Sequence, residues 1–243
     1  MASTSEVGHA KNVANFQSLI AFVTGYGATY NPIKNAIKLA NLNTLLATSQ
    51  TKVADVVTKN TIFNNAINDR FEAFSPLRTL STRLVNALET TDATPQKIKD
   101  AKGFNRKMQG KKAGSTAKPA DPNTPAPTTI SASQQSYDQQ IQHLAGLIAV
   151  LQSEPSYSPN ENELKVATLT AKQAELLTKN NAVATAYTGV SNSRIARDKT
   201  LYKLDTGLTD TAAEVKKYVK AIFGASSPEF AQVKGIQFKK VPK

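Results

Sequence analysis

Residues 30–80, YNPIKNAIKLANLNTLLATSQTKVADVVTKNTIFNNAINDRFEAFSPLRTL, decide the architecture of this chain because a second stretch matches them. A shift of 127 positions lays them on residues 157–207 without a gap, and sixteen of the 51 pairs are identical. Unrelated stretches of ordinary composition would share roughly three or four. Self-similarity at a constant offset is typical of a duplicated unit. Identical pairs include Tyr30 with Tyr157, Pro32 with Pro159, Lys38 with Lys165, Leu42 with Leu169 and Arg70 with Arg197.

The similarity continues on both sides of this block. Upstream, the apolar pattern repeats at an offset of 128, and downstream Thr94-Pro95 matches Ser227-Pro228. The repeated unit is therefore about 100 residues long, which is the size of a domain and too long for a solenoid module. We predict a flexible tail over 1–9, a first unit over 10–110, a linker rich in Pro, Ala, Ser and Thr over 111–133, and a second unit over 134–243.

Hydrophobic periodicity predicts helices throughout both units. In the first unit they cover residues 10–24, 33–74 and 76–89, and in the second 133–152, 160–201 and 209–223. The long helix of the first unit carries a heptad-like seam, spaced alternately by three and four residues. The seam positions are 39, 42, 46, 49, 53, 56, 60, 63, 67, 70 and 74. We therefore predict an all-α protein of two homologous three-helix units, packed antiparallel into one elongated bundle.

The composition limits the chemistry available to the chain. It contains no cysteine, which excludes disulfides, thiolate nucleophiles and sulfur metal ligands. The most apolar windows, residues 19–23 and 144–151, are far too short to span a membrane. The N-terminus shows no charged stretch followed by an apolar one, so we see no secretory signal and expect a cytoplasmic protein.

Positive charge gathers at the end of each unit. The net charge is +12, and residues 101–132 carry six basic side chains against one acidic. The ends read GFNRKMQGKKAGSTAK and KGIQFKKVPK, and large apolar residues stand among their cations. Such segments neutralise phosphates or simply keep a protein soluble. The candidate polyanion-binding residues are Lys102, Arg106, Lys107, Lys111, Lys112, Lys234, Lys239 and Lys240.

Signals for catalysis and metal binding are weak. Glu6 and His9 have the ExxH spacing of a di-iron bundle, but no second such pair is apparent. His143 is not repeated in the other unit, and we expect a packed or surface histidine. No phosphate loop or nucleophile elbow is present. Arg70 and Arg197 occupy equivalent places near the ends of the long helices, where we expect ion pairs that set the register or a site for an anion. We predict no catalytic residue, metal or cofactor.

Three strings carry a resemblance to a known family. With NRKMQGKKA (105–113), SNSRIARDKTLYKLDTGL (191–208) and AIFGASSPEF (221–230), the chain resembles an uncharacterised all-helical family of Bacteroidetes bacteria. The resemblance covers most of the chain. It implies a bacterial, intracellular, non-membrane protein and carries over no catalytic or binding residues.

We therefore expect a non-enzymatic structural or scaffolding protein that binds another macromolecule, either a protein partner or a second copy of the chain, through its helical faces. The alternative is a nucleic-acid-associated protein that uses the basic ends of both units as one surface. A weaker alternative is a membrane-active helical protein, and an enzyme would require a buried polar pocket between the units.

Overall fold

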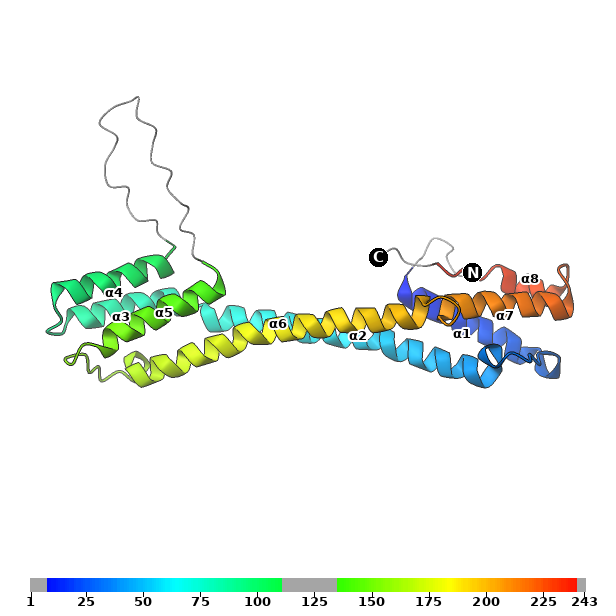
Figure 1. The fold of residues 1–243 in the computed structure, drawn as a ribbon, viewed down its shortest axis with the longest axis horizontal. Coiled ribbons are helices and arrows are strands. Elements are labelled where there is room, and N and C mark those ends of the chain that lie inside the picture. The colour runs from blue at the N-terminus through cyan, green and yellow to red at the C-terminus, as the bar shows by residue number, and fades with distance from the viewer. Residues whose placement is uncertain (1–7, 111–134, 240–243) are drawn as a thin grey trace, which may run out of the picture. The chain divides into compact units, whose positions relative to one another are not determined.

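The computed structural model describes residues 8–110 and 135–239, and every regular element in those ranges is a helix, as predicted. Figure 1 shows the helices along the chain. They are α1 (His9–Gly25), α2 (Leu39–Phe74), α3 (Leu77–Glu89), α4 (Pro95–Met108), α5 (Tyr137–Gln152), α6 (Val166–Tyr202), α7 (Leu208–Phe223) and α8 (Pro228–Lys234). Short 3₁₀ turns lie at η1 (Gly27–Thr29), η2 (Asn35–Ile37) and η3 (Asn162–Leu164). The predicted linker 111–133 and most of the predicted N-terminal tail lie outside the described residues.

Both long helices begin later than the sequence predicts. Helix α2 begins at Leu39 rather than at residue 33, and α6 begins at Val166 rather than at residue 160. A 3₁₀ turn precedes each of them, and the backbone of Lys38 and of Lys165 is then extended for one residue. Helical periodicity cannot distinguish these turns from a first α-helical turn.

Helices α4 and α8 are not predicted by the sequence analysis, although both carry a recognisable start. The Thr94 hydroxyl accepts a hydrogen bond from the Lys97 N–H, and the Ser227 hydroxyl accepts one from the Phe230 N–H. A proline follows each cap, at the helix position where a missing N–H costs nothing. Neither helix shows a clear apolar stripe in the sequence, because α4 is strongly basic and α8 has only seven residues. Each half of the described chain thus forms four α-helices rather than the three predicted.

The described helices group into two compact units that do not coincide with the halves of the sequence. Among the described residues, unit 1 contains 8–63 and 186–239, and unit 2 contains 64–110 and 135–185. Helix α1 therefore lies in one unit with α7 and α8, and helix α5 lies in the other with α3 and α4. One part of each long helix lies in unit 1, and the other part lies in unit 2. The boundaries of the sequence repeat differ from those of the compact units. They remain a prediction.

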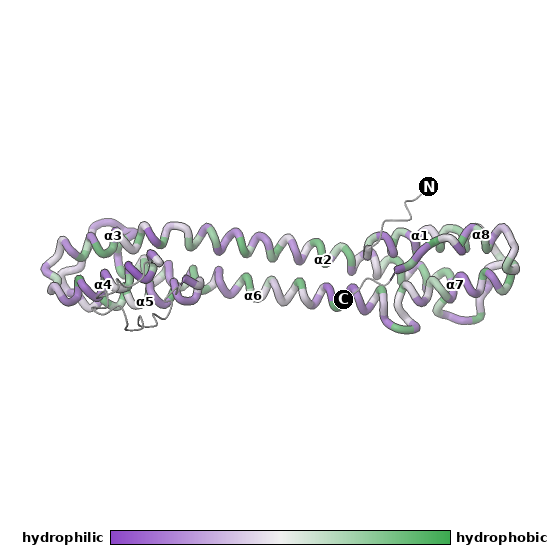
Figure 2. The backbone as a smooth tube through the Cα atoms, turned by 90° about the horizontal axis from the view of Figure 1, so that it is seen from above, coloured by the Kyte–Doolittle hydropathy of each residue, from purple (hydrophilic) through white to green (hydrophobic). Residues whose placement is uncertain are grey.

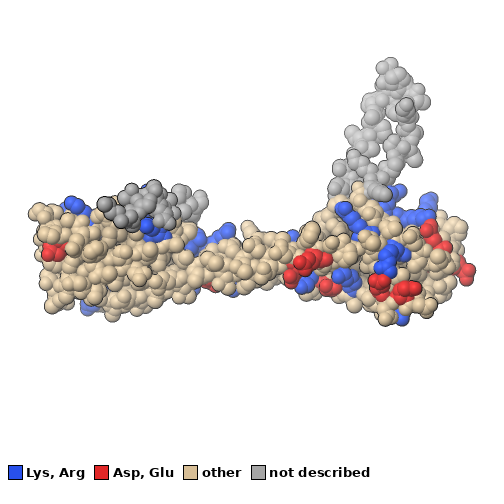
Figure 3. Space-filling model, turned by 180° about the vertical axis from the view of Figure 1, so that it is seen from behind, with Lys and Arg blue, Asp and Glu red and all other residues tan. Residues whose placement is uncertain are grey.

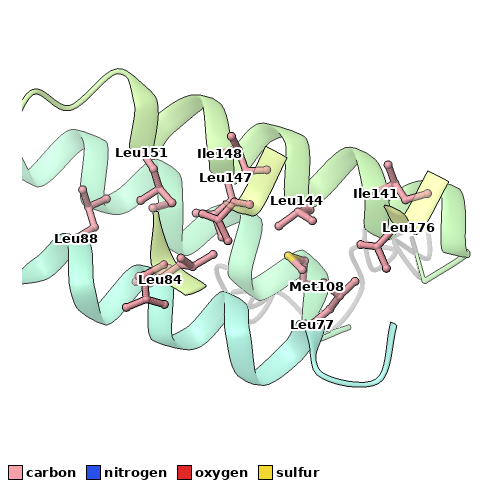
Figure 4. Packing of buried hydrophobic residues seen from close by; sticks show 14 of the residues in the cluster. Leu77, Leu84, Leu88, Met108, Ile141, Leu144, Leu147, Ile148, Leu151 and Leu176 are labelled. Carbon is pink, nitrogen blue, oxygen red and sulfur yellow. The ribbon is translucent and has the colours of Figure 1, made fainter. Parts of the chain in front are cut away.

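The core of unit 2 forms between α3, α4 and α5. Figure 4 shows its side chains pointing toward one another from these helices and from α6. Leu77, Leu84 and Leu88 from α3 meet Leu144 and Leu147 from α5, and all five are fully buried. Their spacing along each helix is three, four or seven residues, so one face of each helix enters the core. Burying a leucine side chain contributes about 1.5–3 kcal/mol, which makes this cluster the main stabilising feature of the unit.

The core of unit 1 forms between α1, α7 and α8. Phe16 and Leu19 from α1 are fully buried against Leu208, Val215 and Val219 from α7. The buried Val233 from α8 belongs to the same cluster. The helices are thus held by apolar faces that no helix can bury alone.

A tyrosine holds the turn before each long helix in the same way. The Tyr30 hydroxyl donates to the Ile37 carbonyl oxygen over 2.7 Å, and the Tyr157 hydroxyl donates to the Leu164 carbonyl oxygen over 2.9 Å. Both bonds span seven residues, and both tyrosines are buried. The matching tyrosines of the sequence repeat therefore have the same local role.

The predicted seam of α2 is turned away from solvent along its whole length. All eleven seam positions are buried or half-buried, including the polar Ser49, whose hydroxyl donates to the Leu45 carbonyl oxygen. Figure 2 shows hydrophobic and hydrophilic residues alternating along both α2 and α6. In unit 1 the Phe63 and Tyr187 rings lie 5.6 Å apart, and in unit 2 Asp69 pairs with Lys179. Helices α2 and α6 therefore contact each other in both units.

Gly207 is the N-cap residue of α7 and lies in the tight turn that follows α6. A Cβ atom there would lie 2.7 Å from the backbone N and O of Lys203 and 2.9 Å from the Leu201 carbonyl oxygen. Because backbone atoms cannot rotate away, we expect Gly207→Ala to lower the free energy of unfolding by about 1–3 kcal/mol in urea denaturation. The matched control is Gly235→Ala, whose new Cβ meets nothing within 4 Å. Equal stability of the two variants would contradict this account of the turn.

Candidate functional site

The first group of predicted basic residues lies on α4 in unit 2. Lys102, Arg106 and Lys107 are exposed there. Lys102 forms an ion pair with Glu89 at the end of α3, and the Lys107 ammonium lies 5.5 Å from the centre of the Phe104 ring. Arg106 and Lys107 stand in the last turn of the helix, where positive charge complements the helix dipole. Lys111 and Lys112 lie outside the described residues.

The second group lies in unit 1. Lys234 stands in the last turn of α8, and Lys239 ends the described chain, while Lys240 lies outside it. The main chain of Lys239 is held by Asn12 of α1: its N–H donates to Asn12 Oδ1 over 3.1 Å, and its carbonyl oxygen accepts from Asn12 Nδ2 over 2.7 Å. The structure thus assigns the two predicted basic ends to different compact units. The expectation that they form one surface stays a prediction.

Side chains of α1 and α7 also hold the main chain of the residues before Lys239. The Gln237 carbonyl oxygen accepts a hydrogen bond from Asn15 Nδ2 over 2.7 Å, and Lys216 Nζ donates to the Ile236 carbonyl oxygen. The Phe238 ring meets the Phe16 ring edge to face. Partial burial lowers the pKa of Lys216. These contacts explain why the KGIQFK stretch is apolar at alternate positions, as the sequence shows.

The two seam arginines have different partners. Arg70 Nη1 donates to Asn180 Oδ1 over 3.1 Å, and its guanidinium carbon lies 4.0 Å from the centre of the Tyr137 ring. Its buried Nε has no hydrogen-bond partner among the described residues. Arg197 instead pairs with its neighbour Asp198, to which Nε and Nη2 donate over 2.9 and 2.8 Å. Adjacent residues of a helix do not normally face each other, and here the long guanidinium chain bends back to reach the carboxylate.

A polar cluster that the sequence did not reveal surrounds His9. The ring Nδ1 lies 2.8 Å from the Tyr202 hydroxyl oxygen, and this oxygen accepts a hydrogen bond from Asn12 Nδ2 over 3.2 Å. Partial burial, followed by the positive charge of Arg197, lowers the pKa of His9. His9 lies at the start of α1 and Tyr202 at the end of α6, so only the fold brings them together. We interpret the cluster as a structural contact of unit 1.

Neither a metal-binding cluster nor a membrane-spanning helix occurs within residues 8–110 and 135–239. In those ranges no group of three or more His, Cys, Asp or Glu side chains is arranged to hold a metal ion. No helix in the same ranges is both long enough and apolar enough to cross a membrane.

Unit 2 contains a pocket of about 270 Å³ beside Tyr157, lined mainly by polar groups. The end of α3 and the turn before η3 form its walls. The lining residues are Ala87, Thr90, Thr91, Ser156, Tyr157, Ser158, Pro159, Asn160 and Glu161. Burial, together with the negative charge of Glu161, raises the pKa of Tyr157 to about 12. Two other pockets in this unit are of similar size: one is lined by Leu80, Arg83 and Leu169, and the other by Phe71, Arg78 and Tyr137.

Glu154 holds the turn that forms one wall of the pocket. Its carboxylate accepts hydrogen bonds from the backbone N–H and the hydroxyl of Ser156, over 3.1 and 2.6 Å, and from Lys97 Nζ over 3.0 Å. These bonds, those from Ser156 first, lower the pKa of Glu154 to about 2. Only 8% of the residue is exposed, so the turn depends on a carboxylate that stays charged.

Comparison of the chain with protein-family models, with curated proteins and with solved structures gives no match.

The low pKa of Glu154 predicts an acid-sensitive turn. Because the pKa is lower in the folded chain than in the unfolded one, the stabilisation is present above about pH 4.5 and is lost as the pH falls toward about 2. We expect Glu154→Gln to be less stable than the wild type at pH 7 and to show a smaller loss of Tm between pH 5 and about pH 2.5. Glu175→Gln on α6 is the control. A wild-type pH profile unchanged in Glu154→Gln would refute the prediction.

Proposed function

We propose that this protein is a non-enzymatic helical scaffold and that it binds a protein partner through an exposed face of α6 in unit 1. The observation that carries the proposal is the exposure of Tyr187 and Ile195, whose accessible fractions are 59% and 63%. Apolar side chains that lie close together on an exposed surface are typical of a contact surface.

The surroundings of Tyr187 and Ile195 favour a partner over solvent alone. No charged residue occurs in α6 between Lys179 and Arg194, so the helix around Tyr187 carries no charge of its own, while Ile195 lies directly after Arg194. The Tyr187 ring already rests on Phe63, with the ring centres 5.6 Å apart. A partner would therefore meet an aromatic side chain that has lost part of its freedom, which lowers the entropic cost of binding. Unit 1 also exposes Val57 on α2, with an accessible fraction of 63%.

We also infer that the scaffold arose by duplication of one four-helix segment. Three features support this beyond the sequence match: the hydroxyl bonds of Tyr30 and Tyr157, the caps of Thr94 and Ser227, and the buried faces of α3 and α7. On this interpretation α1 to α4 correspond in order to α5 to α8. A duplicated scaffold would offer related but unequal surfaces on its two units.

A photo-crosslinking amino acid at position 187 or 195, introduced into the full chain in cells, tests the proposed face. We expect a discrete higher-mass adduct from both positions and none from a probe at Thr51, which is exposed on α2 of the same unit. The variant Ile195→Lys, with the probe at 187, should abolish the adduct while Tm stays unchanged, because the Ile195 side chain is largely exposed. Equal adduct yields at 187, 195 and 51 would refute the proposal.

Binding of nucleic acid is a second candidate function, and the exposed basic face of α4 favours it. Lys99, Lys102 and Arg106 follow one another at spacings of three and four, so they lie on one side of the helix. Figure 3 shows Lys and Arg side chains, with some Asp and Glu, on the surface of this unit. Cations arranged in this way contact successive phosphates and release counterions.

Titration of labelled single-stranded and duplex DNA and RNA at about 50 and 200 mM salt tests this function. If this face of α4 binds phosphates, replacing Lys99 and Arg106 with glutamine should lower the slope of log affinity against log salt by about two. The control replaces Lys38 and Lys203, which are exposed in unit 1, and should change the slope less. No binding by the wild type at low salt would exclude the function.

A further inference from the structure

At one corresponding place, unit 1 has an aromatic side chain and unit 2 has a pocket. In unit 1 the Tyr218 ring of α7 packs edge to face against Tyr30, with ring centres 5.3 Å apart and planes at 86°. In unit 2 the corresponding tyrosine is Tyr157, and the pocket of about 270 Å³ lies beside it.

The residue of α3 that corresponds to Tyr218 is Ala87. The buried positions of the two helices match at a constant offset of 131: Leu77, Ser81, Leu84 and Leu88 in α3 correspond to Leu208, Ala212, Val215 and Val219 in α7. Position 87 therefore falls on position 218. Ala87 lines the pocket, so unit 2 has a methyl group where unit 1 has a phenol ring.

We propose that this pocket of unit 2 binds a small aromatic molecule that carries an amine, with its ring against Tyr157 in the place that Tyr218 fills in unit 1. The space suffices for such a molecule, since a cavity of about 150 Å³ already accepts benzene. Edge-to-face contact between two rings is a favourable arrangement in its own right.

Four polar side chains of the lining can only accept hydrogen bonds from a ligand, while the Ser158 hydroxyl and the Asn160 amide can also donate. The Thr90 and Thr91 hydroxyls donate to the carbonyl oxygens of Ala87 and Leu88, over 2.8 and 2.7 Å, so toward the pocket they can only accept. The Ser156 hydroxyl is likewise used as a donor, to Glu154. The carboxylate of Glu161 accepts only and adds a negative charge.

The pocket is also accessible. Thr90, Ser158, Asn160 and Glu161 are exposed residues at its rim, so a ligand can enter without unfolding the unit. Tyr157 itself is occupied by its bond to the Leu164 carbonyl oxygen and offers its ring rather than its hydroxyl. An aromatic ammonium compound such as tyramine matches both parts of the site, with its ring on Tyr157 and its amine near Glu161.

Tyramine binding to the full-length chain, followed by calorimetry and ligand-observed NMR, tests the proposal. We expect one site per chain, and at least roughly tenfold weaker binding of 4-hydroxyphenylacetate, which carries a carboxylate in place of the amine. Ala87→Tyr should fill the pocket and abolish binding. Failure of the wild type to bind tyramine, or equal affinity for the two compounds, overturns the proposal.

A second variant keeps the test decisive if Ala87→Tyr does not fold. Glu161→Gln changes only an exposed rim residue and should weaken tyramine binding by about fivefold while leaving p-cresol, which has no charge, unaffected. Glu163→Gln, two residues away and paired with Arg83, is the matched control and should leave both affinities unchanged. An equal loss of tyramine affinity in both variants overturns the assigned position of the amine.

Discussion

The seams of the two long helices are the constraint on which the rest of this fold depends. An amphipathic helix of 36 or 37 residues presents an apolar stripe that neither a loop nor a short helix can cover along its whole length. Helices α2 and α6 contact each other along their length, as the Phe63 and Tyr187 rings and the ion pair of Asp69 with Lys179 show. Because each long helix belongs to both compact units, the short helices that follow or precede it must complete cores with partners from the other half of the chain. The composition of the units follows from this pairing.

Two ion pairs favour the same pairing of helices from different halves of the chain. The turn before each long helix is tied to a helix of its own unit by an ion pair, Lys34 with Glu214 in unit 1 and Arg83 with Glu163 in unit 2. The first half of the sequence supplies both cations, and the second half supplies both carboxylates. If each half folded on itself, Lys34 would face Arg83 and Glu163 would face Glu214. Exposed ion pairs stabilise a fold only slightly, but placing like charges opposite each other discriminates against a wrong arrangement.

The sequence predicts those parts of the structure that depend on local pattern. The seam of α2, the breaks around residues 26–32 and 75–76, and the helices α1, α3, α5 and α7 all follow from the spacing of apolar residues and from Gly and Pro. It does not predict α4, whose apolar face is narrow, or the membership of the units, because periodicity does not say which stripe meets which. The basic candidates on α4 and α8 could be named from composition. The contact between His9 and Tyr202 joins residues 193 positions apart and has no local signal.

Comparison of the two halves reveals the pocket beside Tyr157, which neither half would suggest alone. Position 87 could not be recognised as special from its own surroundings, since an alanine on a half-buried helix face is ordinary. It becomes informative because Tyr218 shows that a ring fits the corresponding place. The turn opposite differs too, with Lys34 in the first half where the second half has Glu161. Between the two halves, one wall and the rim of this site therefore differ together. That coincidence concerns chemistry at the surface rather than stability of the core, which is maintained by other side chains.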